Sequence, residues 1–359
     1  MPAPQRLWKT ALGASVMLAS AVVWSALAGL IIPSAALAQA KWERKAPFPE
    51  PAEEVLGIGA GGKMYVFAGL APVWKPLGLV YEYDPAADKW TKKQPMARPS
   101  HHVAFAEYQG KIYAFGGFVL PQSGPPAWVP IDNAWEYDPA TDAWKALAPM
   151  PTRRGAAAAA VIDGKAYVVG GATVPTGTNE PAVAPGRPHL AVGTLEEYDI
   201  ATNTWRERRP MPTARNHLLA GAVGGKLYAI GGRIGAAFIG LASDTDVVEE
   251  YDPASDLWRI KARMPTPRSA LAGGVYEGRV YVAGGEMQDT QKSATFRAFE
   301  GYDPASNTWT VMPPMPVSRH GMAGGVAGNQ IHLVSGDVQS AGSGLEVSAN
   351  YHDVFTFAK

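Results

Sequence analysis

Apolar residues occur along this chain in six short runs, each opened by a polar residue and closed by glycine. The runs read KMYVFAG, KIYAFGG, KAYVVGG, KLYAIGG, RVYVAGG and QIHLVSG, and they begin at Lys63, Lys111, Lys165, Lys226, Arg279 and Gln330. Short segments rich in β-branched and aromatic residues and bounded by glycine predict β-strands. The sequence therefore predicts an all-β protein with a strand at each of these six places.

These strands belong to a longer repeat with a period of about 50 residues. Each unit carries one tryptophan, at Trp42, Trp90, Trp144, Trp205, Trp258 and Trp309. In five units a Tyr-Asp pair precedes the tryptophan, and the residues between them, such as Asp-Pro-Ala, favour a turn. A repeat of this length with these landmarks is typical of a propeller built from four-stranded blades. The repeated tryptophans and tyrosines are expected to pack between neighbouring blades.

The two ends of the repeat predict how the ring closes. Six tryptophans indicate six blades, each with strands a, b, c and d. The last unit, residues 319–359, contains strands a and b and a third strand near 354–357, but no tryptophan. We expect the segment around Trp42 to supply strand d of this last blade, which leaves no open sheet edge. Deletion of residues 41–48 should open the ring.

Length variation is confined to one connection, the loop between strands b and c. This segment is shortest between Gly69 and Asp84 and longest between Gly171 and Asp199. Because b–c and d–a connections leave an up-and-down blade on one face, we expect that face to be the working surface. Trp74 and Trp128 lie in two of these loops outside the repeat. They are candidates to stack on a sugar or anchor a protein, unless each packs over its own loop.

Four arginines occupy one position of the repeat, in the turn just before strand a: Arg154, Arg215, Arg268 and Arg319. Propeller symmetry brings equivalent positions to one mouth of the central channel. A set of guanidinium groups there would suit a carboxylate or phosphate ligand, which each group can hold with two hydrogen bonds. The alternative is that each arginine pairs with main-chain carbonyls or with a neighbouring acid.

The next two positions of the repeat carry further polar residues. His102 and His217 are equivalent to each other, His101 and His320 share the preceding position, and the first blade has Glu53 and Glu54. We therefore add His101, His102, His217 and His320 to the candidate ligand-binding residues. If the protein is an enzyme, one of these histidines is the candidate general base. No short His-x-His or His-Glu spacing is present, so neither a metal site nor a cofactor is expected.

The combined pattern GGK-x-Y-V-x-GG, E-YDP-x-x-x-x-W and MP-x-x-R resembles the kelch repeat, and it extends from Trp42 onward. The resemblance implies a six-bladed kelch β-propeller over residues 41–359, with four antiparallel strands per blade. It also implies that the arginine belongs to the ordinary consensus of this position. Kelch propellers serve several functions, and the fold alone selects none of them.

Two functions remain open at this stage. The first is a binding module that holds a protein, a peptide or a sugar on the loop face. The second is an enzyme of carbohydrate metabolism. Bacterial N-acetylneuraminate epimerase is an exported kelch propeller that acts on an anionic sugar. This chain is similar to it in export signal, blade number and arginine positions. Galactose oxidase also shares the architecture, but its copper site needs a cysteine joined to a tyrosine. The chain has no cysteine, which excludes that activity.

Charge and the N-terminal segment bound the partners and the location. Thirty-two basic and 32 acidic side chains cancel, so nucleic acid or an anionic membrane is not expected as the partner. Residues 1–40 combine Arg6 and Lys9 with a long apolar stretch and two small-residue sites, Ala36-Leu37-Ala38 and Ala38-Gln39-Ala40, so cleavage is expected after Ala38 or Ala40. This arrangement predicts a signal peptide and a secreted or periplasmic protein. An uncleaved membrane anchor is the alternative.

Overall fold

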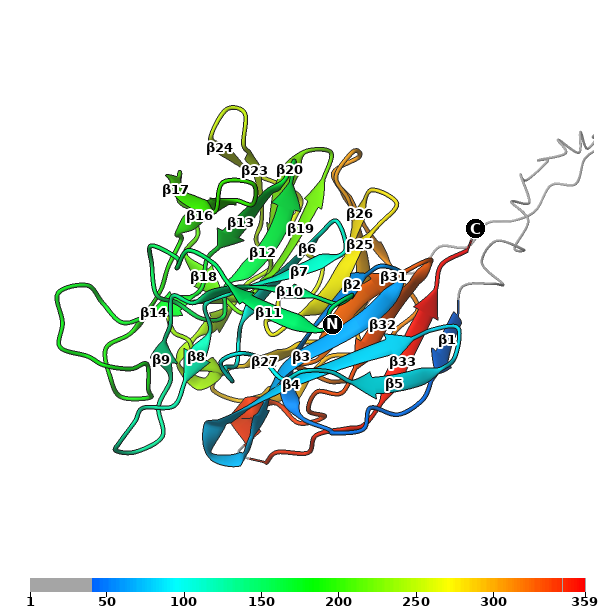
Figure 1. Ribbon diagram of the computed structural model, residues 1–359, viewed down its shortest axis with the longest axis horizontal. Helices are drawn as coiled ribbons and strands as arrows, with labels where there is room; N and C mark the ends of the chain where they lie inside the picture. Colours follow the sequence, from blue (N-terminus) through cyan, green and yellow to red (C-terminus); the bar gives the residue numbers. More distant parts are fainter. Residues whose placement is uncertain (1–40, 344, 359) are drawn as a thin grey trace, which may run out of the picture. The chain divides into compact units, whose positions relative to one another are not determined.

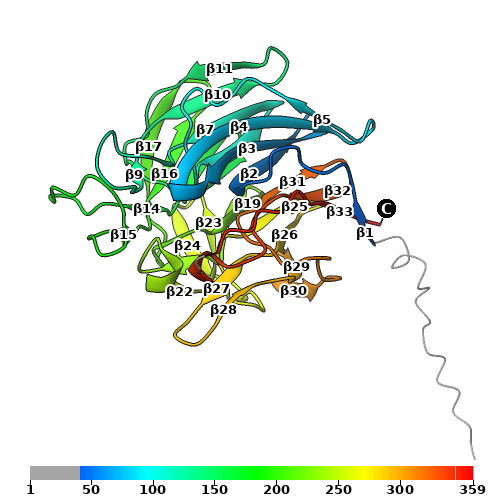
Figure 2. The ribbon, with the colours of Figure 1, turned by 90° about the horizontal axis from the view of Figure 1, so that it is seen from below.

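The computed structural model describes residues 41–343 and 345–358, so the predicted signal peptide lies outside the described residues. In this part of the chain six four-stranded antiparallel sheets form the blades of a propeller. Their innermost strands contact one another in the order β2, β6, β12, β19, β25, β31 and back to β2. Figures 1 and 2 show the blades side by side around this central group of strands. The predicted fold class and blade number are confirmed.

Each blade runs outward from the axis as strands a, b, c and d. The first three blades are β2 (Glu53–Ala60), β3 (Lys63–Ala71), β4 (Lys75–Asp84) and β5 (Lys89–Lys92); β6 (Ala104–Tyr108), β7 (Lys111–Phe115), β10 (Ala134–Asp138) and β11 (Ala143–Ala146); and β12 (Ala158–Ile162), β13 (Lys165–Val169), β16 (Leu195–Asp199) and β17 (Thr204–Arg208). The next two are β19 (Leu219–Val223), β20 (Lys226–Ile230), β23 (Val248–Asp252) and β24 (Leu257–Ile260), and β25 (Ala272–Tyr276), β26 (Arg279–Ala283), β29 (Phe299–Asp303) and β30 (Thr308–Val311).

The sixth blade joins the two ends of the propeller. It contains β31 (Ala323–Ala327), β32 (Gln330–Val334) and β33 (His352–Thr356), and its outer strand is β1 (Lys41–Arg44). β1 pairs antiparallel with β33 (Figure 2), and in this register Trp42 lies opposite Phe355. The indole N–H of Trp42 also donates to the carbonyl of Pro313 in the fifth blade, at 2.9 Å. The predicted closure by the Trp42 segment is therefore confirmed.

The repeated aromatic residues lock each blade to the one before it. In the third blade the Trp205 indole donates to the carbonyl of Ala148 at 2.8 Å, and the Tyr198 hydroxyl donates to Asn203 Oδ1 at 2.7 Å. The same Oδ1 atom accepts the N–H of Ala148, so one turn residue ties its own blade to its neighbour. Equivalent indole bonds occur in all six blades. Packing between blades, as predicted, explains why these residues recur in each unit of the repeat.

The inner strands are rich in glycine and alanine because they converge on the axis. At Gly59 in β2, a Cβ atom would lie 1.7 Å from the carbonyl oxygen of Val326 in β31, so a side chain is sterically impossible there. Strand b of each blade is instead fully covered by its neighbours, and Leu227 to Ile230 in β20 are all buried. Small inner and large middle residues thus produce the wedge shape that a radial blade needs.

The variable b–c loops carry short ribbons of their own. These are β8 (Phe118–Val119) with β9 (Val129–Pro130), β14 (Ala172–Thr173) with β15 (Leu190–Ala191), β21 (Arg233–Ile234) with β22 (Ser243–Asp244), and β27 (Glu286–Gln288) with β28 (Ser293–Thr295). The 3-10 turns η2 (Pro72–Trp74), η3 (Ile239–Leu241) and η4 (Ala341–Ser343) and the short strand β18 (Arg215–Asn216) complete this layer. In Figure 1, β8, β9 and β14 project together from one end of the blades, which we call the loop face.

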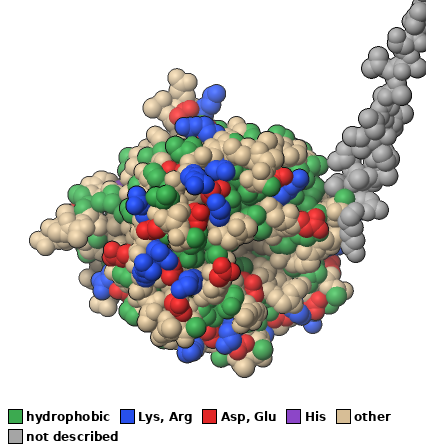
Figure 3. Space-filling view, turned by 90° about the horizontal axis from the view of Figure 1, so that it is seen from above, with side chains coloured by type: hydrophobic (Ala, Val, Ile, Leu, Met, Phe, Trp, Pro, Cys, Tyr) green, Lys and Arg blue, Asp and Glu red, His purple; other side chains and the backbone are tan. Residues whose placement is uncertain are grey.

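On the face seen from above, charged side chains of both signs are mixed, and lysine and arginine alternate with aspartate and glutamate (Figure 3). Among the described residues, no helix has the length and apolar character that crossing a bilayer requires.

Candidate functional site

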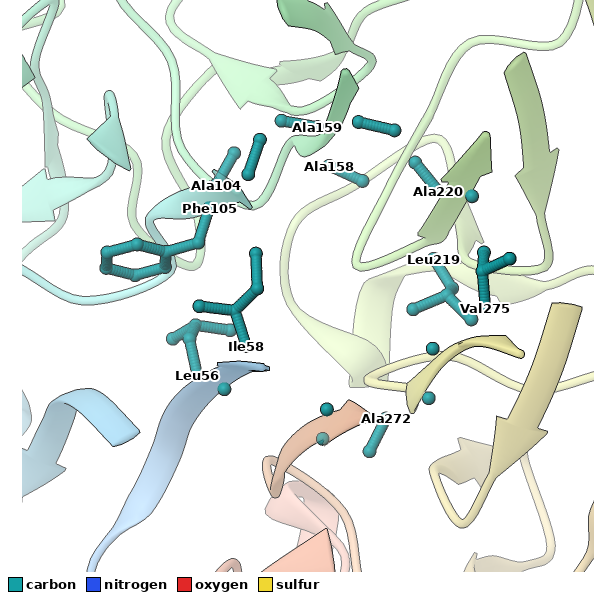
Figure 4. Close-up of a pocket in the computed structure, with 18 of the residues that line it drawn as sticks. Leu56, Ile58, Ala104, Phe105, Ala158, Ala159, Leu219, Ala220, Ala272 and Val275 are labelled. Carbon is teal, nitrogen blue, oxygen red and sulfur yellow. The ribbon is translucent and has the colours of Figure 1, made fainter. Parts of the chain in front are cut away.

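The axis of the propeller contains an apolar channel. Its volume is about 350 Å³, and all six inner strands line it. Figure 4 shows Leu56, Ile58, Ala104, Phe105 and Ala220 among the side chains around the open space, and the drawn side chains contain only carbon. Among the residues that line this part of the channel, Glu107 is the only one with a polar side chain.

At the loop-face end the channel narrows at six equivalent residues, which we call the neck ring: Glu54, His102, Ala156, His217, Ala270 and Gly321. All six have a left-handed backbone, with φ between 50° and 57°. Main-chain hydrogen bonds join neighbours, for example from Ala156 N to His102 O at 2.8 Å and from His217 N to Ala156 O at 2.9 Å. The bond from Val55 N to Gly321 O links the last blade to the first. The ring thus holds three polar side chains at fixed places around the axis.

Beyond the neck ring lies a second cavity, the upper pocket, with a volume of about 390 Å³. Glu54, His102 and His217 line both this pocket and a small cavity of about 60 Å³ that continues into the channel. The walls come from the b–c loops of several blades. They include Trp74, Trp128, Arg233, Phe238, Leu241 and Gln288.

Three aromatic residues from three blades form one wall of the upper pocket. Trp128 lies 4.3 Å from Phe238 and 5.8 Å from Trp74, measured between ring centroids. Trp128 also lies 4.8 Å from the imidazole of His102. Its main chain pairs with Val183 of the third loop, so the wall is fixed from two directions. Trp74 and Phe238 are half-buried and keep part of their rings accessible.

The floor of the pocket contains buried ionisable groups. His102 Nε2 lies 3.2 Å from Glu54 Oε2. Burial opposes ionisation of Glu54, but its contact with His102 outweighs this effect and holds the pKa of Glu54 well below its usual range. Burial lowers the pKa of His217 far below its usual value, so this imidazole is neutral. Burial, with the charge of Glu54, raises the pKa of Glu53 to about 9. The floor therefore holds the Glu54 carboxylate beside the protonated carboxyl of Glu53 and the neutral imidazole of His217.

A second buried ion pair stands in the pocket wall. Arg233 donates to Glu286, to Ser269 Oγ and to the carbonyl of Ala237. Glu286 also accepts hydrogen bonds from Ser340 Oγ and from the N–H of Ala341, each at 2.8 Å. These contacts join the fourth, fifth and sixth blades and leave the Arg233 guanidinium fully engaged.

The four predicted arginines do not line an open mouth, and that expectation is corrected. Arg154, Arg215, Arg268 and Arg319 are completely buried. Each pairs with a carboxylate inside its own blade, namely Glu196, Glu249, Glu300 or Asp353. Each also donates to main-chain carbonyls, such as those of Gly231 and Ala229 for Arg215. Arg319 Nε is the one guanidinium nitrogen of the four without a hydrogen bond among the described residues, and it is buried, so none of these side chains presents a donor at an open mouth.

The remaining candidates divide into two groups. His102, His217 and Trp74 line the upper pocket, as does Trp128, although Trp128 is 6% exposed and is a buried wall residue rather than an exposed anchor. His101 and His320 are fully buried behind the ring. His101 contacts His102 through their Nδ1 atoms, and His320 Nε2 lies 3.7 Å from Glu286 Oε2. These two histidines therefore support the pocket from outside it.

Sequence reasoning did not select Glu54, Phe238 or Arg233 as site residues. Glu54 occupies the same repeat position as His102 and His217, so alignment of the six units contains the signal that unites them. Phe238 and Arg233 lie in a variable loop, where no repeat position predicts which side chains turn toward the axis. The three ligand atoms of Glu54, His102 and His217 lie within 4.8 Å of one another, although no short spacing in sequence indicates this.

Comparison with known families agrees with this architecture. Models described as "Kelch motif" match residues 59–97, 99–151, 214–265 and 267–316, and a second model of the same description matches residues 153–212. The chain belongs to the kelch-repeat family. Kelch-repeat propellers are typically protein-interaction modules.

Similar proteins include Kelch-like protein 25 from Xenopus tropicalis and Kelch-like protein terF from Aspergillus terreus. Both are 29% identical, over 57% and 59% of this kelch chain, which covers 32% and 44% of their own lengths. The chain thus spans less than half the length of these relatives. Among solved structures, YjhT matches with a TM-score of 0.68 and 18% identity, covering 87% of this chain and 97% of that one. This last likeness shows the shared fold.

Proposed function

We propose that this kelch propeller is an exported binding module that holds a small neutral ligand, such as a sugar ring, in the upper pocket. The observation that carries this proposal is the aromatic wall of Trp74, Trp128 and Phe238 above the polar floor of Glu54, His102 and His217. An apolar wall facing a few fixed polar groups is the usual construction of a small-molecule site.

Size and hydrogen bonding support a ligand of this kind. A volume of about 390 Å³ lies in the range of small-molecule pockets. The indole N–H of Trp128 is buried and has no acceptor among the described residues, which favours a ligand that brings an oxygen to it. A sugar offers both an apolar ring face for the aromatic wall and hydroxyl oxygens for the floor.

Charge favours a neutral ligand over the anionic sugar considered from the sequence. The four repeat arginines are buried and paired, and Arg233 is engaged by Glu286. The carboxylate of Glu54 stands at the floor, and Arg233, the only lysine or arginine among the described lining residues, is already paired, so an anionic ligand would meet a like charge.

The proposal is tested by thermal unfolding with a panel of neutral and acidic sugars, measured in EDTA. A ligand at a hundredfold excess over its Kd should raise the free energy of unfolding by about 2.7 kcal/mol. The stabilisation should occur with neutral sugars and disappear in Trp74→Ala. The half-buried position of Trp74 makes this change less damaging to the fold than a change at Trp128.

The matched control is Ile260→Ala, because Ile260 is 76% exposed on an outer strand and does not line the pocket. It should keep the full response to the sugar. No response to any sugar in the wild-type protein would refute the small-ligand proposal and leave a protein partner at the loop face as the better hypothesis.

An enzymatic role is the second candidate, and the pairing of Glu54 with His102 at the pocket floor favours it. Buried ionisable groups within hydrogen-bond reach are typical of acid–base sites. If a sugar that binds is also converted, NMR of the mixture should show a new sugar signal with time. Glu54→Gln should then abolish conversion, while a stable mixture would reject catalysis on that sugar.

Export is a separate part of the proposal and rests on residues 1–40. The positive n-region, the apolar stretch and the Ala38-Gln39-Ala40 site support removal of a signal peptide. Expression of the full chain in a secreting bacterium, followed by intact-mass measurement of the extracytoplasmic protein, tests it. A mass that retains residues 1–38 would reject cleavage.

A further inference from the structure

The neck ring places three metal-binding side chains around one point on the axis. Glu54, His102 and His217 come from the first, second and fourth blades, while the other three ring positions are Ala156, Ala270 and Gly321. The small residues leave room at the centre, and the polar ones converge on it. One ligand atom from each of the three lies within 4.8 Å of the others.

The protonation of His217 is set by its neighbour. The amide of Asn216 donates from Nδ2 to the carbonyl of Ala236 at 2.9 Å, which directs Oδ1 at His217 Nδ1. Nδ1 must therefore carry the proton, so the neutral ring presents a bare lone pair at Nε2. This Nε2 atom is buried and has no partner among the described residues. A buried acceptor without a donor carries a free-energy cost unless something binds it.

Glu54 and His102 complete a donor set beside this lone pair. In the described part of the chain, no lysine or arginine pairs with Glu54, and its partner is His102 Nε2 at 3.2 Å. His102 Nδ1 contacts His101 Nδ1, so the ring of His102 is held from behind, as Asn216 holds His217. Metal-binding histidines are commonly oriented by such a contact at the nitrogen that does not bind the metal.

We propose that Glu54, His102 and His217 bind one divalent transition-metal ion at the neck ring, with Zn²⁺ as the best-suited probe. Two imidazoles and one carboxylate are an established donor set for zinc sites that keep an open position. All three residues also line the upper pocket, so a metal ion held by them would stand at the floor of the proposed ligand site. Ligand atoms around tetrahedral zinc lie about 3.4 Å apart, so binding requires only small side-chain movements from the present arrangement.

Without a metal, Glu54 and His102 form a close carboxylate–imidazole pair, and His217 Nε2 has no partner among the described residues. The two arrangements differ in a measurable way, because only the metal site needs all three residues together. The inference goes beyond the proposed function and does not depend on it, since the ring exists whether or not a sugar binds in the pocket.

The test titrates Zn²⁺ into the EDTA-treated, dialysed protein without any sugar, in competition with a chromophoric zinc indicator. We expect one equivalent to bind, and His217→Ala and Glu54→Gln each to weaken binding by at least about 100-fold. The matched control is His189→Ala, which removes a loop histidine that is not part of the ring and should leave the affinity unchanged. X-ray absorption of the zinc-loaded wild-type protein should show two imidazole ligands.

The wild-type absorption spectrum decides the question even if a ring variant does not fold. Zinc bound with no imidazole signal, zinc binding unaffected by both ring variants, or no stoichiometric binding would each overturn the proposal. The sugar test stays separate, because it is run in EDTA and depends on Trp74. Trp74→Ala should lose sugar binding and keep zinc, so failure of one proposal is distinguishable from failure of the other.

Discussion

Substitution of Arg215 by alanine should destabilise the propeller severely without any ligand being involved. Arg215 is fully buried, and its guanidinium donates to the carbonyls of Thr213, Ala229 and Gly231 and to the carboxylate of Glu249. Removal of one partner of a buried ion pair leaves the other charge buried without a partner, which lowers the free energy of unfolding by about 3–5 kcal/mol. Three main-chain carbonyls also lose their donor, at about 1 kcal/mol each if none is replaced.

We therefore expect the free energy of unfolding to fall by about 4 kcal/mol or more, which is a large fraction of the 5–15 kcal/mol typical of a folded protein. The melting temperature should fall by about 8 °C, at roughly 2 °C per kcal/mol for a large domain. Urea unfolding followed by tryptophan fluorescence measures the first quantity, and calorimetry the second. The control is Arg263→Ala, because Arg263 forms an exposed ion pair with Asp246 and contributes little.

A double-mutant cycle separates the ion pair from general loss of packing. The variant Arg215→Met/Glu249→Leu removes both charges and keeps most of the volume, so it should be more stable than Arg215→Ala. A change below about 1 kcal/mol in Arg215→Ala would refute the buried-pair reasoning. A loss of affinity for anions at unchanged stability would instead return this residue to the ligand site.

Two further predictions concern closure and acid stability. Trp42→Ala should lower the free energy of unfolding, measured by urea titration, by about 3–5 kcal/mol. The substitution removes the hydrogen bond to Pro313 and the ring contacts with Phe299 and Phe355 that close the propeller. An unchanged urea midpoint would contradict closure by β1. Burial lowers the pKa of His332 to about 4, so on acidification the unfolded chain binds this proton before the folded protein does. The contribution of His332 to the free energy of unfolding should therefore be fully present above about pH 6.5. It should decline by about 3 kcal/mol as the pH falls to 4. His332→Phe should make this decline shallower in unfolding measured across that pH range, while the neighbouring His352, whose pKa burial lowers to about 3, keeps its own share. An equal slope in both proteins would contradict the assignment.

The sequence alone predicts the six blades, their strand order and the closure of the ring. These features depend on local patterns that repeat, so each unit carries the information independently: an apolar strand ended by glycine, a turn before Trp205 or Trp258, and small residues in the inner strand. The pairing of Trp42 with the last blade also follows from counting, because one unit lacks its fourth strand. Repetition makes such predictions robust, since six copies of a pattern report the same structure.

The partners of individual side chains were decided only by the tertiary structure. The repeat placed Arg215 correctly in the turn before strand a, but its pairing with Glu249, 34 residues later in strand c of the same blade, turns the guanidinium inward. Likewise, Glu54, His102 and His217 share a repeat position, yet their convergence depends on the radius of the ring and on the left-handed backbone that aims them at the axis. The composition of the upper pocket depends on loops that do not repeat. Local pattern determines the scaffold because hydrogen bonding within a blade is local, whereas the site forms where blades distant in sequence meet.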